Sequence, residues 1–252
     1  METIRFKVTG TSPYLMHSAR LMSQEDESGG LGVRRVPPPA EEARGGLYVT
    51  DGGVLYAPAA AFKSALVEAM RGRRIGKRSG TVVMGSNCFE TLTECPLADP
   101  ATGEPLHQYR IDIRRVVIRG RGGVRRARPR IDAWVCEVEF EYDPDFLTPR
   151  VLLEAMRLAG TQVGIGDYRP RPGGTGKGGP MGRFVAAVVA CSDPGWADEV
   201  ADRLSLTDED EDDGDDGEGG GDAMARVQAH LSRIADGGLG GTERPQRRRA
   251  RA

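Results

Sequence analysis

The chain has 252 residues, of which 38% are hydrophobic and 35 are glycine, and its formal net charge is −2. It has no run of about 18 apolar residues, which excludes a membrane-spanning helix. Its first ten residues, METIRFKVTG, also lack the apolar stretch of a signal peptide, so we expect a cytoplasmic protein with no membrane partner.

The small net charge conceals a segregation of charge along the chain. Residues 1–190 hold 27 Lys and Arg against 21 Asp and Glu, a balance of +6, whereas residues 191–252 hold 8 against 16, a balance of −8. This asymmetry predicts a basic domain followed by an acidic tail. We place the domain at residues 1–193 and the tail at residues 194–252.

The tail is poor in apolar residues. Nine of the eleven residues over 208–218 are acidic, and 217–221 adds four glycines. Such a stretch buries too little apolar surface to offset the entropy lost on ordering. Residues 194–252 are therefore predicted to be largely disordered, with a short helix at 223–235.

The cysteines do not form a metal-binding pattern. They stand at scattered spacings with no C-x-x-C pair, and the chain has three histidines to help them. A structural zinc site needs clustered thiolates or imidazoles. We therefore expect no metal and no cofactor, and reduced thiols in a cytosolic core, at Cys88, Cys95, Cys136 and Cys191.

The first elements in chain order are a strand and a long insertion. Residues 3–9 (TIRFKVT) alternate apolar and charged side chains, which predicts a half-buried strand. Residues 18–46 have no period and include three consecutive prolines, so we expect a loop. A hairpin follows over 47–56, where DGG separates two short apolar runs. The loop and hairpin form an insertion over residues 18–57.

Two helices are predicted. The first covers residues 58–71, because Pro58 suits a first helical turn and apolar residues follow it at spacings of three and four. The second runs from Thr148 to Gly160, with Thr148 as N-cap and Pro149 at the first position.

Three further strands are predicted, over 109–118, 131–142 and 183–190, with a very basic turn over 119–130. The element order is then strand, helix, strand, strand, helix, strand. This order predicts an α+β protein with a ferredoxin-like (βαββαβ) antiparallel sheet and two helices on one face. The other face of the sheet is left open for a ligand.

The strongest functional signal is the density of arginines over residues 110–130, where Asp112 is the single acidic residue. Guanidinium groups held this close repel one another unless an anion neutralises them. A polyphosphate backbone supplies evenly spaced anions and releases counterions on binding. The alternative is a solvated loop, or pairing with the acidic tail. The predicted contacts to nucleic acid in this run are Arg114, Arg115, Arg119, Arg121, Arg125, Arg126, Arg128 and Arg130.

Two other segments add positive charge. A basic loop after the first helix contributes Arg71, Arg73, Arg74, Lys77 and Arg78. The glycine-rich segment 164–182 is not a P-loop, because Gly178 follows Lys177 and a strand comes next. Its glycines let a backbone approach closely, at Gly164, Gly166, Gly173, Gly174 and Gly182. The segment also supplies positive charge through Arg169, Arg171 and Lys177, and Arg183 follows it directly.

The glycine-rich loop before the last strand and the order of elements resemble the RAMP superfamily (repeat-associated mysterious proteins), the ferredoxin-like proteins of CRISPR systems. The segment Tyr56–Leu66 (YAPAAAFKSAL) is similar to their entry into the first helix. Val8–His17 (VTGTSPYLMH) resembles their first strand and the turn after it. The resemblance covers about residues 3–190. The chain is short for a backbone subunit of that family, and the acidic tail departs from the pattern.

The resemblance implies RNA or DNA binding, most like the subunits that polymerise along a guide, and in that family the glycine-rich loop touches the RNA backbone. A small phage-encoded relative would fit equally well. We therefore predict a non-catalytic protein that tracks the phosphate backbone of single-stranded RNA or DNA, as repeated copies along the strand.

Two alternatives stay open. Some members of the superfamily cleave RNA without a metal, using a histidine, and His17, near Tyr14 and Ser18, is the candidate here. The other alternative is a structural or assembly protein that associates with itself through its segregated charges.

Overall fold

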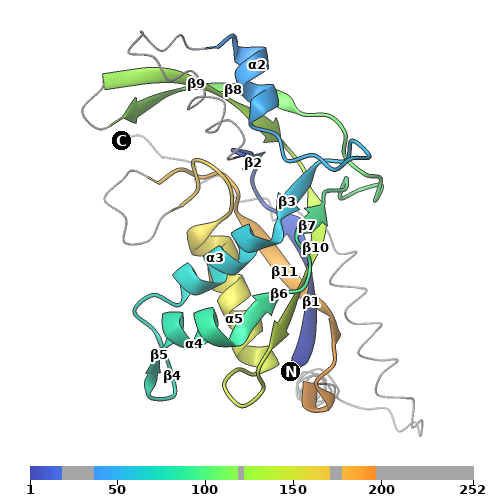
Figure 1. Ribbon diagram of the computed structural model, residues 1–252, viewed down its shortest axis with the longest axis vertical. Helices are drawn as coiled ribbons and strands as arrows, with labels where there is room; N and C mark the ends of the chain where they lie inside the picture. Colours follow the sequence, from blue (N-terminus) through green and yellow to red (C-terminus); the bar gives the residue numbers. More distant parts are fainter. Residues whose placement is uncertain (19–36, 119–121, 171–177, 197–252) are drawn as a thin grey trace, which may run out of the picture. The chain divides into compact units, whose positions relative to one another are not determined.

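The computed structural model contains a four-stranded antiparallel sheet against which two helices pack (Figure 1). Its strands, in spatial order, are β11 (Phe184–Cys191), β1 (Glu2–Gly10), β10 (Val135–Tyr142) and β6 (Cys88–Glu90). Each neighbouring pair runs antiparallel. With the helices that pack on it, this sheet makes the protein an α+β fold, as the sequence predicts.

The chain divides into two units, Met1–Asp193 and Pro194–Ala252. Nearly all of the second unit, including the predicted acidic tail and its predicted helix, lies outside the described residues. The fold below is therefore that of the first unit. The structure describes residues 1–18, 37–118, 122–170 and 178–196.

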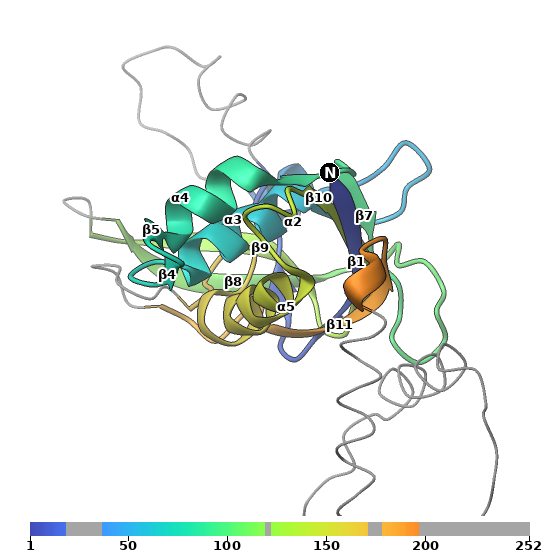
Figure 2. The ribbon, with the colours of Figure 1, turned by 90° about the horizontal axis from the view of Figure 1, so that it is seen from below.

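The core forms between one face of the sheet and two helices. Alternate residues of β1, namely Ile4, Phe6 and Val8, are buried, and so are alternate residues of β10. Helices α3 (Ala59–Ala69) and α5 (Pro149–Leu158) lie on the same side of the sheet (Figure 2). The alternation in the sequence therefore marks the buried face correctly in both strands.

The second helix begins as predicted and ends later. Thr148 caps α5, and its side chain accepts a backbone hydrogen bond from the first turn (3.3 Å). The helix continues as a π-helical turn, η1 (Ala159–Val163), and the chain leaves it at Gly164 with a φ of +69°. Gly160, the predicted end, instead packs against β11, where an added Cβ would lie 2.1 Å from the Phe184 carbonyl oxygen.

One predicted core strand belongs to a different sheet. Strand β8 (Arg110–Ile118) pairs with β9 (Gly122–Ile131), and β9 pairs with β2 (Tyr14–Leu15). The short strand β6 occupies the place in the core sheet that we expected β8 to take. Arginines lie on both faces of β8, and its Ile111 and Ile113 are 43% and 51% exposed. Neither face of β8 is apolar enough to join a core.

The predicted basic turn is also wrong. Strand β9 fills most of residues 119–130, so its arginines lie on a strand rather than on a turn. Because β8 and β9 pair along nearly their whole length, arginines that are far apart in the sequence become direct neighbours.

The predicted insertion over residues 18–57 contains a helix that the sequence did not reveal. Helix α2 (Pro39–Gly45) begins at the last of the three consecutive prolines, a position where proline is tolerated. It carries Glu41 and Glu42 in its first turn, where acidic side chains favour the helix dipole. Proline, read as a signal for a loop, here starts a helix.

The hairpin predicted over 47–56 is present as a short bridge between Val49 and Leu55. The chain then enters β3 (Tyr56–Pro58), which pairs with β7 (Glu94–Pro96). These two strands connect the insertion to the core elements.

The basic segment 71–78 forms a hairpin rather than a loop. Strands β4 (Arg74–Ile75) and β5 (Arg78–Ser79) pair, and α4 (Gly80–Asn87) follows them. Figure 1 places this hairpin at the opposite end of the unit from β8 and β9. None of the helices in the described part of the chain is long and apolar enough to cross a membrane.

All four cysteines are free, and Cys88, Cys95 and Cys136 are buried, as predicted for thiols of a core. Burial raises the pKa of Cys88 to about 11 and that of Cys95 to about 12. These thiols are therefore protonated and chemically inert at neutral pH.

Candidate nucleic-acid interface

The arginine ribbon, defined as β8 and β9 from Arg110 to Arg130, places arginines opposite one another. Side chains directly across an antiparallel pair have Cβ atoms about 4.5–5.5 Å apart, and like charges there destabilise the pairing. The opposed arginines therefore destabilise the ribbon wherever no anion offsets their repulsion. The opposed pairs are Arg110 with Arg130, Arg114 with Arg126, and Arg115 with Arg125.

Two aspartates neutralise part of one face of the ribbon. Asp112 accepts two hydrogen bonds from Arg114, one of them 2.8 Å long, and lies 3.5 Å from Arg130. The hydrogen bond from Arg114 holds the pKa of Asp112 below its usual value. Asp132 pairs with Arg130 and, at 3.2 Å, with Arg110. These arginines are held by carboxylates of the protein itself.

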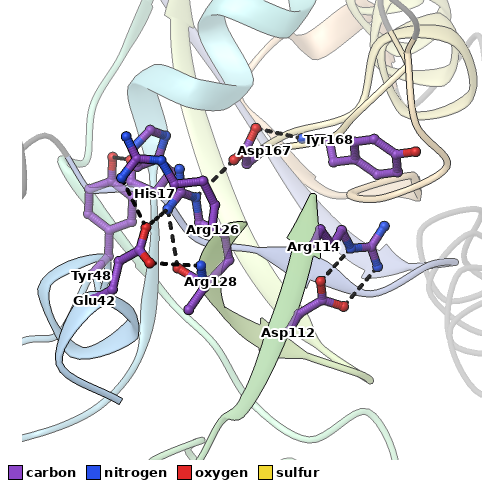
Figure 3. Close-up of polar contacts among 10 residues, drawn as sticks. His17, Glu42, Tyr48, Asp112, Arg114, Arg126, Arg128, Asp167 and Tyr168 are labelled. Atoms are coloured by element: carbon purple, nitrogen blue, oxygen red, sulfur yellow. Dashed lines mark hydrogen bonds and ion pairs between the residues drawn. The ribbon is translucent and has the colours of Figure 1, made fainter. Parts of the chain in front are cut away.

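Glu42 of α2 performs the same role farther along the ribbon. It is 3% exposed, and its carboxylate lies 3.4 Å from the Arg126 guanidinium and 3.3 Å from that of Arg128 (Figure 3). It also accepts a 3.0 Å hydrogen bond from the backbone N–H of Ala127. Strand β2 pairs with β9 at Ile131 and Arg130 and does not extend to Ala127. Glu42 therefore accepts a backbone hydrogen bond on the edge of β9 that β2 leaves open.

Arg115 and Arg125 differ from the other two pairs. Both side chains are exposed, they lie directly across from each other, and neither forms an ion pair with a residue that the structure describes. Their mutual repulsion is therefore not offset within the described part of the chain. Among the described arginines of the ribbon, this pair is where an external anion would stabilise the protein most.

The two described ends of the glycine-rich segment, 164–170 and 178–182, pack closely against each other and against β2. Gly164, Gly166 and Gly182 all have positive φ. A Cβ on Gly182 would lie 1.8 Å from the Ile165 carbonyl oxygen, and a Cβ on Gly166 would lie 2.4 Å from the Leu15 carbonyl oxygen. Only glycine permits this close approach of backbones. The two ends of the segment are therefore locked together.

Asp167 and Tyr168 join this segment to the ribbon. The Asp167 carboxylate accepts a 2.9 Å hydrogen bond from Arg128 Nε. Burial raises the pKa of Asp167, but the hydrogen bonds from Arg128 and from the Tyr168 N–H outweigh it and lower the pKa overall. The Tyr168 ring lies under the guanidinium of Arg114, 4.8 Å from ring centroid to Cζ.

A pocket of about 190 Å³ opens beside these contacts and contains His17. The Tyr48 hydroxyl donates a 3.1 Å hydrogen bond to the His17 carbonyl oxygen, and Figure 3 shows the imidazole close to Arg126. Partial burial lowers the pKa of His17, and so does Arg128, whereas Asp167 opposes them. The pocket is lined by Tyr14, His17, Tyr48, Pro58, Ala61, Gly166 and Asp167.

We expect His17 to make the folded protein less stable as the pH falls below 6.5, the ordinary histidine pKa. The unfolded chain binds a proton there before the folded chain does, so stability rises with pH across this range and levels off above it. His17→Gln should make the free energy of unfolding less dependent on pH between 6.5 and the folded pKa. Urea unfolding at several pH values measures this. An unchanged dependence would show that His17 titrates alike in both states.

The structure brings together one of the two predicted basic regions and the glycine-rich segment. Arg169 is bound to the Gly164 carbonyl oxygen (2.9 Å), and Arg183 is exposed at the start of β11. The β4–β5 hairpin, with Arg71, Arg73, Arg74, Lys77 and Arg78, lies away from the ribbon (Figure 1). The predicted residues outside the described part of the chain are Arg119, Arg121, Arg171, Gly173, Gly174 and Lys177.

Sequence reasoning missed the acidic residues of the site. Glu42 fell in a predicted loop, and Asp132 and Asp167 gave no pattern of their own. The glycines around Asp167 were a usable signal, because they mark a segment whose backbone must pack closely. No such signal exists for Glu42.

No protein-family model matches the sequence, and a search of curated proteins returns no match. The arrangement of the site itself is therefore the basis for any functional conclusion.

Proposed function

We propose that the protein binds single-stranded nucleic acid, RNA or DNA, along the arginine ribbon and the glycine-rich segment. The observation that carries the proposal is the Arg115–Arg125 pair, two exposed guanidinium groups held opposite each other without a carboxylate in the described chain. A phosphate bridging them would remove their repulsion and release counterions. The protein's own carboxylates hold the other arginines of the ribbon that the structure describes, so this part of the ribbon keeps its shape.

The fold supports the proposal. We propose that the core sheet is ferredoxin-like, because its strands lie in the order fourth, first, third, second of the chain's four core strands. Helix α3 connects the first two and α5 the last two. This is the arrangement of the βαββαβ motif. A place among the RAMP proteins, with copies aligned on a strand in the cytoplasm, follows from the sequence resemblance and remains a prediction.

Replacing Arg115 and Arg125 with alanine should weaken binding to a labelled oligothymidylate or oligouridylate. The double variant loses the one phosphate that the two arginines share, so the slope of log affinity against log salt should fall by about 0.7. Fluorescence anisotropy over a range of salt concentrations measures the slope. Different oligonucleotide sequences should be affected alike, because phosphate contacts do not read bases.

The matched control is the double variant Arg73→Ala and Arg74→Ala. It removes the same charge from exposed arginines of the β4–β5 hairpin, at the far end of the unit. We expect its salt slope to stay close to that of the parent protein. An unchanged slope in the Arg115 and Arg125 variant, with an intact melting transition, would refute the proposed site. A reduced slope in the control alone would move the site to the hairpin.

The pocket at His17 favours a second candidate function, metal-independent RNA cleavage. The lowered pKa of His17 keeps its imidazole neutral at neutral pH, which is the form that a general base requires. Asp167 and Tyr48 lie in the same pocket. Incubating the parent protein with labelled RNA in the presence of a chelator decides between the two functions, since only a nuclease shortens the RNA.

A further inference from the structure

Tyr168 is an exposed aromatic residue between the glycine-rich segment and the arginine ribbon. Its surface is 45% accessible, although its ring is in contact with Arg114. Figure 3 shows the ring beside the Arg114 guanidinium, with the hydroxyl directed away from Asp167. The part of the ring that the protein does not cover is therefore available to a ligand.

The backbone of Tyr168 is strained. Its φ is +54°. Among the described residues, all the others with a positive φ are glycines. For a bulky side chain this conformation is an outlier, and it persists only where the surroundings enforce it. Such strain gathers at sites where a protein holds a side chain ready for a ligand.

The surroundings of Tyr168 enforce its position from both sides. Its N–H is bound by the Asp167 carboxylate (2.8 Å), which in turn is bound to Arg128. Its carbonyl oxygen accepts a hydrogen bond from Met181 N–H (3.2 Å). A Cβ on Gly179 would lie 2.3 Å from the ring, so only glycine leaves room for the ring there.

Arg114 gives the ring a rigid support. The guanidinium donates two hydrogen bonds to Asp112 that fix its position, so the stacked pair loses little further freedom when a ligand binds. Arg115, the next residue, points to the other face of β8. Among the described strands β8 pairs with β9 alone, so a nucleic-acid strand bound to Arg115 on one face can cross the free edge of β8 to the face that carries Arg114 and Tyr168.

We propose that Tyr168 stacks against one base of the bound strand, and so makes the site selective for unpaired nucleotides. The inference rests on the proposed function and adds the base contact that arginines alone do not supply. Aromatic rings accept any base, because every base has a π-face. In a duplex the bases are stacked on each other and are not available to the ring.

The first experiment replaces Tyr168 in the full-length chain with asparagine, which accepts positive φ and removes the ring. We expect affinity for a single-stranded oligonucleotide to fall about tenfold or more, the usual effect of removing a stacked aromatic side chain. The slope against salt should not change, because stacking releases no counterions. Tyr168→Phe keeps the ring and should bind like the parent protein.

The matched control is Phe146→Ala. Phe146 is also exposed and also lies under an arginine, 4.9 Å from Arg78, but at the β4–β5 hairpin. Its loss should leave the affinity unchanged. Equal losses from Phe146→Ala and Tyr168→Asn would show an unspecific effect of removing an aromatic residue, and would overturn the proposal.

The second experiment leaves the protein unchanged and compares a normal oligonucleotide with an abasic one of equal length and charge. Stacking on Tyr168 predicts that the abasic strand binds about tenfold more weakly or worse to the parent protein. The two strands should bind nearly equally to Tyr168→Asn. If the abasic strand binds the parent protein as tightly, the stacking proposal is wrong while the arginine site stands. If neither strand binds, the proposed function itself fails.

Discussion

Replacing Glu42 with alanine should lower the free energy of unfolding by about 3 kcal/mol, the low end of the cost of removing one partner from a buried ion pair. Arg126 and Arg128 would lose their shared carboxylate, and the buried N–H of Ala127 would lose the oxygen that accepts its hydrogen bond. The low end applies because the Arg126 side chain remains 25% exposed and can be hydrated. Urea unfolding followed by circular dichroism measures the change.

Two variants separate the causes. Glu41 is the exposed neighbour of Glu42 in the same turn of α2, so Glu41→Ala should change stability little. Glu42→Gln keeps an acceptor for the Ala127 N–H and loses the charge, so its effect should lie between the other two. Equal stability of Glu42→Ala and Glu41→Ala would show that α2 does not hold the ribbon.

Local patterns predict the core of this protein well. The alternation of Ile4, Phe6 and Val8 and the apolar face of β10 are consequences of burial on one face of a sheet, which leaves a period of two in the sequence. The Thr148 cap is equally local, because the Val151 N–H that donates a hydrogen bond to its side chain is three residues away. Features of this kind can be read without knowledge of the tertiary structure.

Pairing between distant strands cannot be read in this way. Strand β6 is only three residues long and has no alternation to recognise, yet it completes the core sheet. Strand β8 has the length of a core strand, but Ile111 and Ile113 are too few to bury a face. A longer run of strand-forming residues therefore predicts a core strand at β8, although the core uses the shorter run at β6.

The charge of the site shows the same limit. The density of arginines is visible in the sequence, but whether each is available to a ligand depends on carboxylates far along the chain. Glu42 neutralises Arg126 and Arg128 from more than eighty residues away. The strand register shows that Arg115 and Arg125 are opposed, and the ion pairs of the described residues include no partner for either. The candidate site is therefore smaller than the arginine count suggests.

Among the described glycines of the glycine-rich segment, Gly182 should be the one whose replacement with alanine is most damaging. The residue has a φ of +66°, which costs an alanine about 1 kcal/mol or more. The added Cβ would also lie 1.8 Å from the Ile165 carbonyl oxygen, a backbone atom that cannot rotate away. Relieving this clash separates the two ends of the segment and breaks the hydrogen bond from Ile165 N–H to the Gly182 carbonyl oxygen (2.9 Å).

We expect a combined loss of about 3 kcal/mol or more in the free energy of unfolding, in the range of strained backbone positions and overpacked sites. Gly85→Ala is the matched control, because Gly85 lies inside α4 with nothing within 4 Å of an added Cβ. Alanine favours a helix interior over glycine, so this variant should be as stable as the parent protein or more so. Thermal and urea unfolding of the two variants give the comparison. A Gly182→Ala protein as stable as Gly85→Ala would show that the two ends of the segment are not locked together, and that Tyr168 is not held in place by them.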